Sequence, residues 1–275
     1  PFLILSELLL SSSVIHLLGR MLEPIMRPLF HLPGVCAFAV ALGFTSGFPM
    51  GASAAAALVR ERLCSREEAA VLAAFTNNSS PLFILSAVSV GMLGYPQVGP
   101  ILLLAHYGAN LILGIMLGFL MPRHNTAVLS PLKGQAAGIS LSQAVRRAIG
   151  SILNIGGFVT LFSVIISLGE NCGLFSVFNH FLALLLGVVG FPVECAAGLN
   201  YGLWEMSLGI NELCGNTAPL LSKLVLISFI LGWGGLCVQA QVCSILLAEN
   251  IQIKYFLLLR PLQAVLSSIL TVVFF

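Results

Sequence analysis

The chain has 275 residues, of which 58% are hydrophobic and only 8% are charged, and its mean hydropathy is +1.04. Because soluble domains carry roughly 25% charged residues, this composition excludes an ordinary soluble protein and indicates one that resides in a lipid bilayer. The formal net charge of +2 is small and the basic residues are scattered among predicted loops, so we predict no nucleic-acid partner.

Apolar segments recur along the chain, and several reach the roughly 20 residues that cross a bilayer as a helix. The chain begins at Pro1 without an initiator methionine, and we expect its N-terminus to be incomplete. The first apolar helix is expected to end near Arg20, before a short amphipathic connector. The first half is predicted to contain spans at 1–19, 67–93 and 97–121 and a re-entrant hairpin at 34–62, with TSGFPMG (45–51) interrupting the hairpin and NNSSP (77–81) interrupting the second span.

A polar connector at 122–147, predicted to be cytoplasmic, leads to a second half with the same order of elements. Its interruptions fall around GLWEMSLGIN (202–211) and GWGGLCVQAQ (232–241), and placing Gly43 on Gly202 aligns the two halves. Recurrent interruptions of this kind are typical of internal repeats in membrane proteins. We therefore predict an all-α polytopic membrane protein of two inverted repeats, the second with spans at 148–169, 218–248 and 253–275 and a re-entrant hairpin at 182–215.

The positive charges favour the inverted arrangement. With the second repeat inverted, Lys223 is the one basic residue of the twelve that falls on the outer side. The others stay inside, in agreement with the tendency of basic residues to remain in the cytoplasm. A competing topology treats 174–190 as a full crossing and moves Lys254 and Arg260 to the outer side. We prefer the inverted arrangement because it agrees better with this tendency.

The interruptions predict a polar centre at membrane depth. An unsatisfied backbone group in hydrocarbon costs several kcal/mol, so a broken helix persists only where protein or a wet cavity surrounds it. Each new half-helix presents free N–H groups and a positive dipole end, which attract anions. We expect Ser46 and Gly47 to end one half-helix before Pro49 opens the next, and the side chains of 77–80 to satisfy the backbone before Pro81.

In the second half, Glu205 is expected near a hairpin tip, where a charge at a helix centre costs roughly 2.5 to 3.5 kcal/mol and so suggests function. The simpler alternatives are hydrogen bonds between neighbouring helices, close packing at glycines, and a shallow hairpin that leaves Glu205 at the surface. The candidate substrate-binding residues are Ser46, Gly47, Pro49, Gly51, Asn77, Asn78, Ser79, Ser80, Glu205, Ser207, Asn211, Gln239 and Gln241.

Several classes of protein are excluded by missing motifs. The chain contains no aspartate and lacks GxSxG, HExxH and GxxxxGK[ST] patterns, so we predict neither an enzyme nor an ATP-driven pump. The histidines and cysteines show no metal-ligand spacing, and no metal or cofactor is predicted. A membrane carrier is the first hypothesis. A scaffold that moves nothing is the second, and it would tolerate substitutions at the four interruptions.

Five motifs together resemble the YlbJ-type sporulation integral membrane proteins, also called stage V sporulation protein V, of the nucleoside-recognition or Gate-domain class. They are MLEPIMRPLFHLPG (21–34), GFTSGFPMGA (43–52), FTNNSSPLFI (75–84), EMSLGIN (205–211) and SFILGWGGLCVQAQV (228–242). The resemblance implies a transporter in the outer forespore membrane that passes dipicolinic acid toward the forespore.

Dipicolinate is a flat pyridine with two carboxylates, and this chemistry suits helix N-termini and hydroxyl or amide donors. On this basis Arg27 and Arg260 are candidate counter-charges, and Glu205 is a candidate for ion or proton coupling. The class leaves a nucleoside or another ion as alternative substrates. The coupling ion, the direction of transport and a homo-oligomeric state are left open.

Overall fold

Helices form every element that the structure assigns. The computed structural model describes Ile4, Leu8 and residues 14–120 and 140–275. Within these residues, the helices long and apolar enough to span a bilayer are Pro96–Leu120, Leu141–Asn171, Leu220–Ala248 and Lys254–Phe274, and the pair Leu17–Phe30 and Gly34–Ser46, bent by 92°, provides a fifth span if counted as one. The predicted all-α polytopic membrane protein is confirmed, whereas the inverted relation of the halves stays a prediction.

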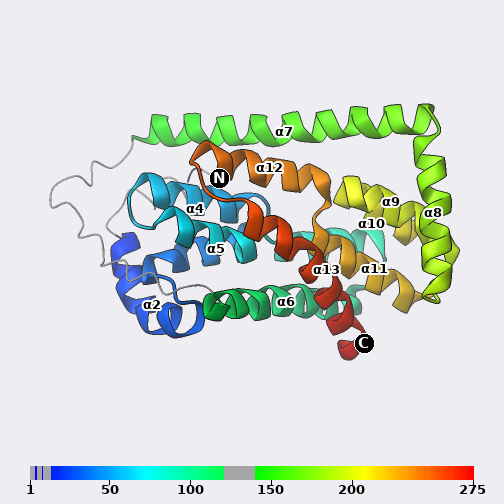
Figure 1. Ribbon diagram of the computed structural model, residues 1–275, viewed down its shortest axis with the longest axis horizontal. Coiled ribbons are helices and arrows are strands. Elements are labelled where there is room, and N and C mark those ends of the chain that lie inside the picture. Colours follow the sequence, from blue (N-terminus) through cyan, green and yellow to red (C-terminus); the bar gives the residue numbers. More distant parts are fainter. Residues whose placement is uncertain (1–3, 5–7, 9–13, 121–139) are drawn as a thin grey trace. The chain divides into compact units, whose positions relative to one another are not determined.

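The first half contains two helices that break where the sequence predicts. The helix before the hairpin differs from expectation, because α2 does not end near Arg20 but continues through Pro24 and Pro28. The Glu23 carboxylate on this helix pairs with Arg27 one turn later. The elements are α2 (Val14–Phe30), η1 (Gly34–Cys36), α3 (Ala37–Ser46), α4 (Met50–Arg60), α5 (Arg66–Thr76), η2 (Phe83–Met92), η3 (Pro96–Val98) and α6 (Gly99–Leu120) (Figure 1).

The second half also contains a hairpin followed by a broken helix, in the same order as the first half. Its elements are α7 (Leu141–Asn171), α8 (Leu174–Val188), η4 (Val193–Cys195), α9 (Ala196–Trp204), α10 (Met206–Gly215), α11 (Leu220–Trp233), α12 (Gly235–Ala248) and α13 (Lys254–Phe274). Helix α7 begins inside the predicted connector because the backbone and side chains of Ser140 and Gln143 exchange hydrogen bonds and cap it. The connector residues 121–139 and most of the predicted span 1–19 lie outside the described residues.

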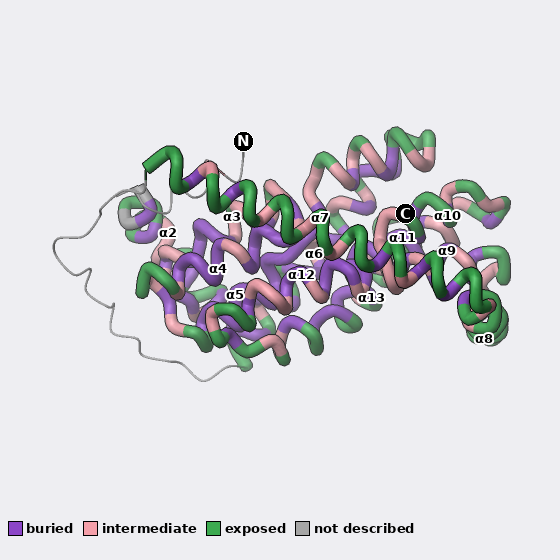
Figure 2. The backbone as a smooth tube through the Cα atoms, turned by 90° about the horizontal axis from the view of Figure 1, so that it is seen from above, coloured by how far each residue is buried: buried purple, intermediate pink, exposed green. Residues whose placement is uncertain are grey.

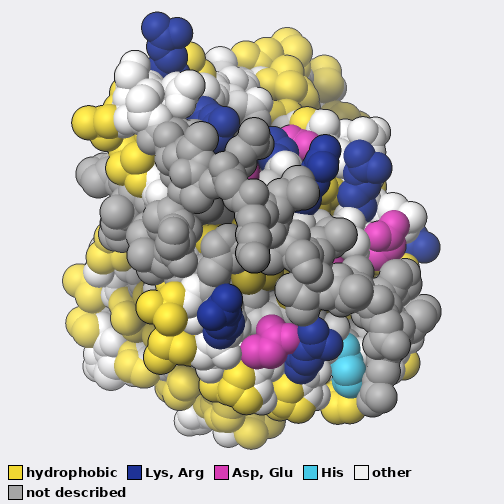
Figure 3. Space-filling model, turned by 90° about the vertical axis from the view of Figure 1, so that its left-hand side faces the viewer, with side chains coloured by type: hydrophobic (Ala, Val, Ile, Leu, Met, Phe, Trp, Pro, Cys, Tyr) yellow, Lys and Arg dark blue, Asp and Glu magenta, His cyan; other side chains and the backbone are white. Residues whose placement is uncertain are grey.

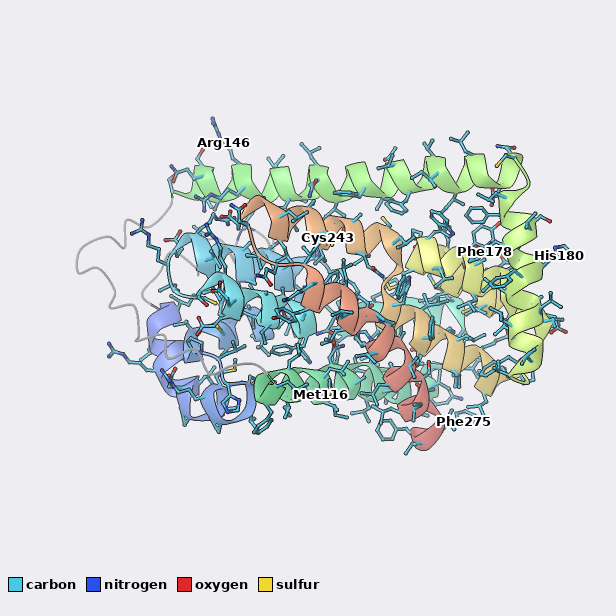
Figure 4. All side chains as sticks on the ribbon, viewed as in Figure 1. Met116, Arg146, Phe178, His180, Cys243 and Phe275 are labelled. Atoms are coloured by element: carbon cyan, nitrogen blue, oxygen red, sulfur yellow. The ribbon has the colours of Figure 1, made fainter. Side chains whose placement is uncertain are left out.

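Most residues of α7 and α8 are exposed or half-buried, as their mostly green and pink tubes in Figure 2 show, and large apolar residues such as Leu153 and Leu184 are among the exposed ones. In the most apolar window of α7 only 11% is buried, against 67% for Leu220–Ala248. In a chain this apolar, such a surface suits contact with lipid. Figure 4 shows Arg146 on α7 and His180 on α8 pointing away from the surrounding helices. Helix α8 has 15 residues and is therefore about 22 Å long, shorter than the roughly 30 Å of hydrocarbon.

The chain divides into two compact units, each drawn from both halves of the sequence. The first comprises residues 1–80, 110–155 and 241–259, and the second comprises 81–109, 156–240 and 260–275.

In the first unit, the hairpin of α3 and α4 packs on α5. The Phe30 and Phe75 rings stack at 5.0 Å beside two glycines of α6. A Cβ at Gly114 would come within 2.7 Å of the Phe75 ring, and one at Gly118 within 2.6 Å of Phe30 O. Glycine at these positions therefore lets α6 lie directly against the two aromatic residues.

The base of the first hairpin is fixed by polar and thiol contacts within the first unit. Arg60 Nη1 lies 3.1 Å from Glu249 Oε1, and Arg66 Nε donates to Glu249 O at 3.0 Å. Several Lys, Arg and Glu side chains are visible on the face of the molecule that Figure 3 shows. Cys36 and Cys64, at the two ends of the hairpin, bring their Sγ atoms to 3.8 Å. The segments that enter and leave the hairpin are thus held together.

The second unit has an apolar core and a polar attachment of its hairpin. Core residues from η2, α8, α10 and α11 pack together, and Phe178, labelled in Figure 4, packs against this core from α8. Asn200 on α9 donates through Nδ2 to Asn179 Oδ1 at 2.7 Å and to Phe175 O at 3.2 Å. These hydrogen bonds hold the first arm of the second hairpin on α8.

Candidate functional site

The first interruption forms the tip of the hairpin of α3 and α4. Helix α3 ends at Ser46, Gly47 follows in the left-handed region with φ of +84°, and Pro49 directly precedes α4. A Cβ at Gly47 would lie 2.9 Å from Ser80 N and 3.0 Å from Ser80 Cβ, so only glycine allows this approach. The predicted end at Ser46 and Gly47 and the new start after Pro49 are confirmed.

The second interruption, between α5 and η2, is joined to the hairpin by Asn77. Asn77 Nδ2 donates to Ala73 O at 2.6 Å, and Asn78 Nδ2 donates to Phe75 O at 3.3 Å, so both amides satisfy carbonyls at the end of α5. Asn77 Oδ1 also accepts a hydrogen bond from Ala52 N, at the start of α4, at 3.0 Å. The prediction that amide side chains satisfy the broken backbone is confirmed for Asn77 and Asn78.

Two glycines of the hairpin enclose the end of α5. A Cβ at Gly43 would lie 1.9 Å from Thr76 O, and one at Gly51 would lie 2.4 Å from the same atom. Any side chain at either position would collide with backbone, so the contact requires glycine at both. The two arms of the hairpin therefore hold Thr76, the residue next to the predicted site residue Asn77.

Some polar atoms at these two interruptions remain available to a ligand. Ser46 Oγ and Asn78 Oδ1 are buried and have no hydrogen-bond partner among the described residues. Ser79 is buried, Ser80 is half-buried, and Pro81 begins the helical segment that continues into η2, as predicted. Buried polar atoms in proteins are nearly always paired, so Ser46 and Asn78 are the strongest of the predicted candidates for ligand binding in the described part of the first unit.

The third interruption lies between α9 and α10, where Glu205 is the N-cap residue of α10. Its carboxylate accepts hydrogen bonds from Ser207 N at 3.1 Å, Leu208 N at 2.8 Å and Ser207 Oγ at 2.6 Å. A carboxylate at a helix N-terminus is stabilised by the helix dipole. Glu205, which is half-buried, thus satisfies the same free N–H groups that were expected to attract an anion.

The fourth interruption separates α11 from α12. Gly234 and Gly235 have φ of +81° and +75°, conformations that favour glycine. Trp233 Nε1 donates to Leu203 O at 3.0 Å, and Gln239 Nε2 donates to Trp233 O at 3.1 Å. The indole of Trp233 and the amide of Gln239 therefore satisfy carbonyls at the ends of α9 and α11.

Each half brings its hairpin tip against the interruption of the next helix. In the first unit Gly47 contacts Ser80, and in the second a Cβ at Gly235 would lie 3.0 Å from Met206 N and 3.3 Å from Glu205 Cα. The sequence pattern thus located two pairs of contacting interruptions. The convergence of both pairs on one substrate site, and the role of each predicted site residue, stay predictions.

The remaining predicted site residues differ widely in their exposure to solvent or lipid. Asn211 is exposed on α10, and Gln241 is buried on α12. The side chain of Arg27 is 53% exposed and pairs with Glu23, whereas Arg260 is fully buried on α13.

Lys223 is a residue whose role the sequence did not indicate. Its Nζ donates to Asn216 O at 2.5 Å and to Cys214 O at 3.2 Å. A cation at the carbonyl end of a helix is favoured by the dipole. The basic residue that departs from the predicted charge distribution is therefore held by the end of α10, a contact that sequence spacing does not reveal.

The broken helices and apolar spans define an integral membrane protein with a transporter-like fold. The structure of CNTnw, a concentrative nucleoside transporter, in an inward-facing substrate-bound state is 14% identical, with a TM-score of 0.56 over 99% of this chain and 73% of that chain. A doubly substituted CNTnw in an outward-facing state is 13% identical, with a TM-score of 0.57 over 99% of this chain and 74% of that chain. At these identities the likeness is one of fold.

Sequence similarity places the chain more narrowly. Residues 1–96 match the Gate family, described as nucleoside recognition. The sporulation integral membrane protein YlbJ of Bacillus subtilis (strain 168) is 36% identical over 289 aligned residues, which cover 98% of this chain and 71% of that protein. The chain belongs to the family of YlbJ-type sporulation integral membrane proteins, and the predicted resemblance is confirmed.

Proposed function

We propose that the protein is a carrier of a small organic anion, dipicolinic acid, across the outer forespore membrane during sporulation. It catalyses no chemical reaction and needs no cofactor in this account. The name of its relative YlbJ supports the link to sporulation, and the fold that it shares with CNTnw supports transport. The substrate and the particular membrane follow from the resemblance together with the chemistry of the interruptions.

The observation that carries this proposal is the contact between the first hairpin tip and the interruption after α5. Gly47 brings the tip against Ser80, and Asn77 binds Ala52 N across the contact. Beside these contacts, Ser46 Oγ and Asn78 Oδ1 are buried with no hydrogen-bond partner in the described part of the chain. A scaffold has no need of buried polar atoms left unpaired, which are costly, whereas a carrier uses them for its substrate.

The chemistry of the interruptions suits a flat dicarboxylate. The hydroxyl of Ser46 is a donor to a carboxylate oxygen, and so are backbone N–H groups at the start of a half-helix where no side chain already accepts their hydrogen bonds. The Glu205 carboxylate already accepts the hydrogen bonds of the N–H groups at the start of α10, so we assign it to the coupling ion or proton rather than to the substrate. With this division the substrate anion binds to the donors, and the coupled cation or proton offsets its charge.

A nucleoside is the second candidate substrate. The description of the Gate family as nucleoside recognition and the fold shared with CNTnw favour it. A nucleoside is neutral and bears ribose hydroxyls, so its binding would not depend on a counter-charge. Competition between the two ligands therefore separates the hypotheses.

Uptake of labelled dipicolinate into proteoliposomes that contain the purified protein tests the proposal. We expect saturable uptake that excess uridine does not reduce. Glu205→Gln retains an acceptor oxygen for the N-terminus of α10 but removes the charge, so we expect a folded protein with at least about tenfold slower uptake. Inhibition by uridine would favour the nucleoside carrier, and the absence of any uptake by folded protein would favour the scaffold.

A further inference from the structure

Helix α13 buries polar side chains and exposes apolar ones. Residues three and four apart lie on one face of a helix. The buried polar residues from Arg260 to Thr271 follow this spacing and extend over about 16 Å at 1.5 Å per residue. On the opposite face Leu258, Leu262 and Ile269 are exposed. We name the fully buried residues of this polar face the α13 stripe: Arg260, Gln263, Ser267 and Thr271.

The C-terminal end of the α13 stripe is explained by helix packing in the second unit. Thr271 Oγ1 lies 2.5 Å from Ser228 Oγ. Next to the stripe, Ser268 Oγ donates to Val225 O and Ala264 O. Such hydrogen bonds commonly join helices in membranes. This end of the stripe therefore needs no ligand.

The middle of the α13 stripe is not explained by packing. Neither side-chain polar atom of Gln263 has a hydrogen-bond partner in the described residues, and neither does Ser267 Oγ. Both residues are 0% exposed, and unpaired polar groups with this burial call for an explanation. One turn earlier lies Arg260, which is also 0% exposed. A permanent cation thus adjoins two hydrogen-bonding side chains available to a ligand.

We propose that the Arg260 end of the α13 stripe binds a small anion, specifically a carboxylate. The fixed charge of a guanidinium repels a cation and attracts an anion strongly where water is excluded. Its planar donors match the two oxygens of a carboxylate, and the Gln263 amide and Ser267 hydroxyl supply further donors. The buried stripe provides charge and hydrogen bonds together, which a purely structural contact does not require.

The carboxylate is assigned to the transported dicarboxylate, and in this respect the inference rests on the proposed function. A Cβ at Gly232 would lie 2.7 Å from Ala264 Cα and 2.9 Å from Gln263 C. Gly232 comes directly before the interruption at Trp233–Gly235. The α13 stripe therefore borders an interruption that is predicted to bind substrate. In this proposal one carboxylate of the substrate binds at the stripe, and the rest of the substrate contacts the interruption.

The test compares a double variant, Gln263→Met with Ser267→Ala, with a matched control, Gln252→Met with Ser163→Ala, both at exposed positions. Equilibrium binding is measured for dipicolinate, with two carboxylates, and for picolinate, with one. We expect the test variant to lose at least about tenfold in dipicolinate affinity and to bind picolinate as the wild type does. Its thermal midpoint should not fall, because apolar side chains replace unpaired polar ones.

Equal dipicolinate affinity in test and control variants would overturn the assignment to the substrate. Thermal stabilisation by chloride and by formate, measured without dipicolinate, then distinguishes a resident inorganic anion from a carboxylate. If the wild type binds no dipicolinate, the proposed function fails. Thermal stabilisation by formate then tests on its own whether the α13 stripe binds a carboxylate. Stabilisation by formate that the test variant loses would support the carboxylate site, and equal stabilisation of all three proteins would refute it.

Discussion

At the scale of residues, polar side chains at the two interruptions of the first half have different roles. Asn77 binds Ala73 O and Ala52 N, so it joins the end of α5 to the start of α4. Ser46 Oγ has no partner among the residues described. The first side chain is needed for the fold, whereas the second is free to meet a ligand.

This difference predicts opposite outcomes for two alanine variants. Asn77→Ala leaves two buried backbone groups unpaired and should lower the free energy of unfolding by about 2 to 4 kcal/mol. Ser46→Ala removes no internal hydrogen bond and should reduce dipicolinate uptake at least tenfold without lowering the thermal midpoint. Asn171→Ala, at an exposed asparagine of α7, is the control for Asn77. Normal uptake by Ser46→Ala would remove that hydroxyl from the site.

Cys64 gives a prediction that depends on pH. It lies between α4 and α5, and the adjacent Cys36 thiol together with burial raises its pKa well above the ordinary value. The thiolate is the reactive form, so Cys64 should stay protonated at neutral pH and react with maleimide only as the pH rises well above 9. The exposed Cys172 should react readily at pH 7.5. Rapid labelling of Cys64 at pH 7.5, identified by peptide mass, would contradict the buried hairpin base.

At the scale of elements, glycine decides how closely the first hairpin approaches α5. A Cβ at Gly43 would collide with Thr76 O, so Gly43→Ala should destabilise the protein by about 1 to 3 kcal/mol or more. Gly156 on α7 has open space around a Cβ, and Gly156→Ala should be neutral or stabilise by up to about 1 kcal/mol. Thermal unfolding in detergent measures both. Equal midpoints for the two variants would show that the hairpin does not lie against α5.

The positions of the helix interruptions could be predicted from the sequence because the residues that cause them lie at the interruptions themselves. Glycine and proline marked the interruptions at 45–51 and 232–241, and the amides of Asn77 and Asn78 indicated how a broken backbone is satisfied. Contacts between distant segments had no such signal. The hydrogen bond that Ala52 N donates to Asn77 Oδ1 and those that Lys223 donates to the end of α10 depend on the fold.

Two further features of the structure, the length of α2 and the buried face of α13, were not predicted from the sequence. Helix α2 continues past Pro24 and Pro28, although proline usually ends or kinks a helix. The polar residues of α13 fall on one face by spacing alone, but the rest of the helix is apolar. Polar side chains in a membrane helix face protein rather than lipid, but their spacing does not show which helices pack against them.

At the scale of the whole molecule, the apolar spans are those of a polytopic membrane protein, and the orientation of the basic residues stays a prediction. The structure ties Lys223 to backbone carbonyls, which gives a local reason for the one departure from the predicted orientation. Each half contains a hairpin tip in contact with the interruption of the next helix. The predicted inverted repeats are an arrangement that carriers use to expose their site alternately to the two sides, and a scaffold does not need them.

Counterflow of dipicolinate tests this account most directly. Proteoliposomes loaded with unlabelled dipicolinate are diluted into a trace of labelled dipicolinate, and internal label is followed with time. A carrier exchanges inner for outer substrate, so we predict a transient overshoot that is absent from protein-free liposomes and at least about tenfold smaller with Ser46→Ala. A monotonic rise to equilibrium, or no entry of label with folded protein, would contradict it.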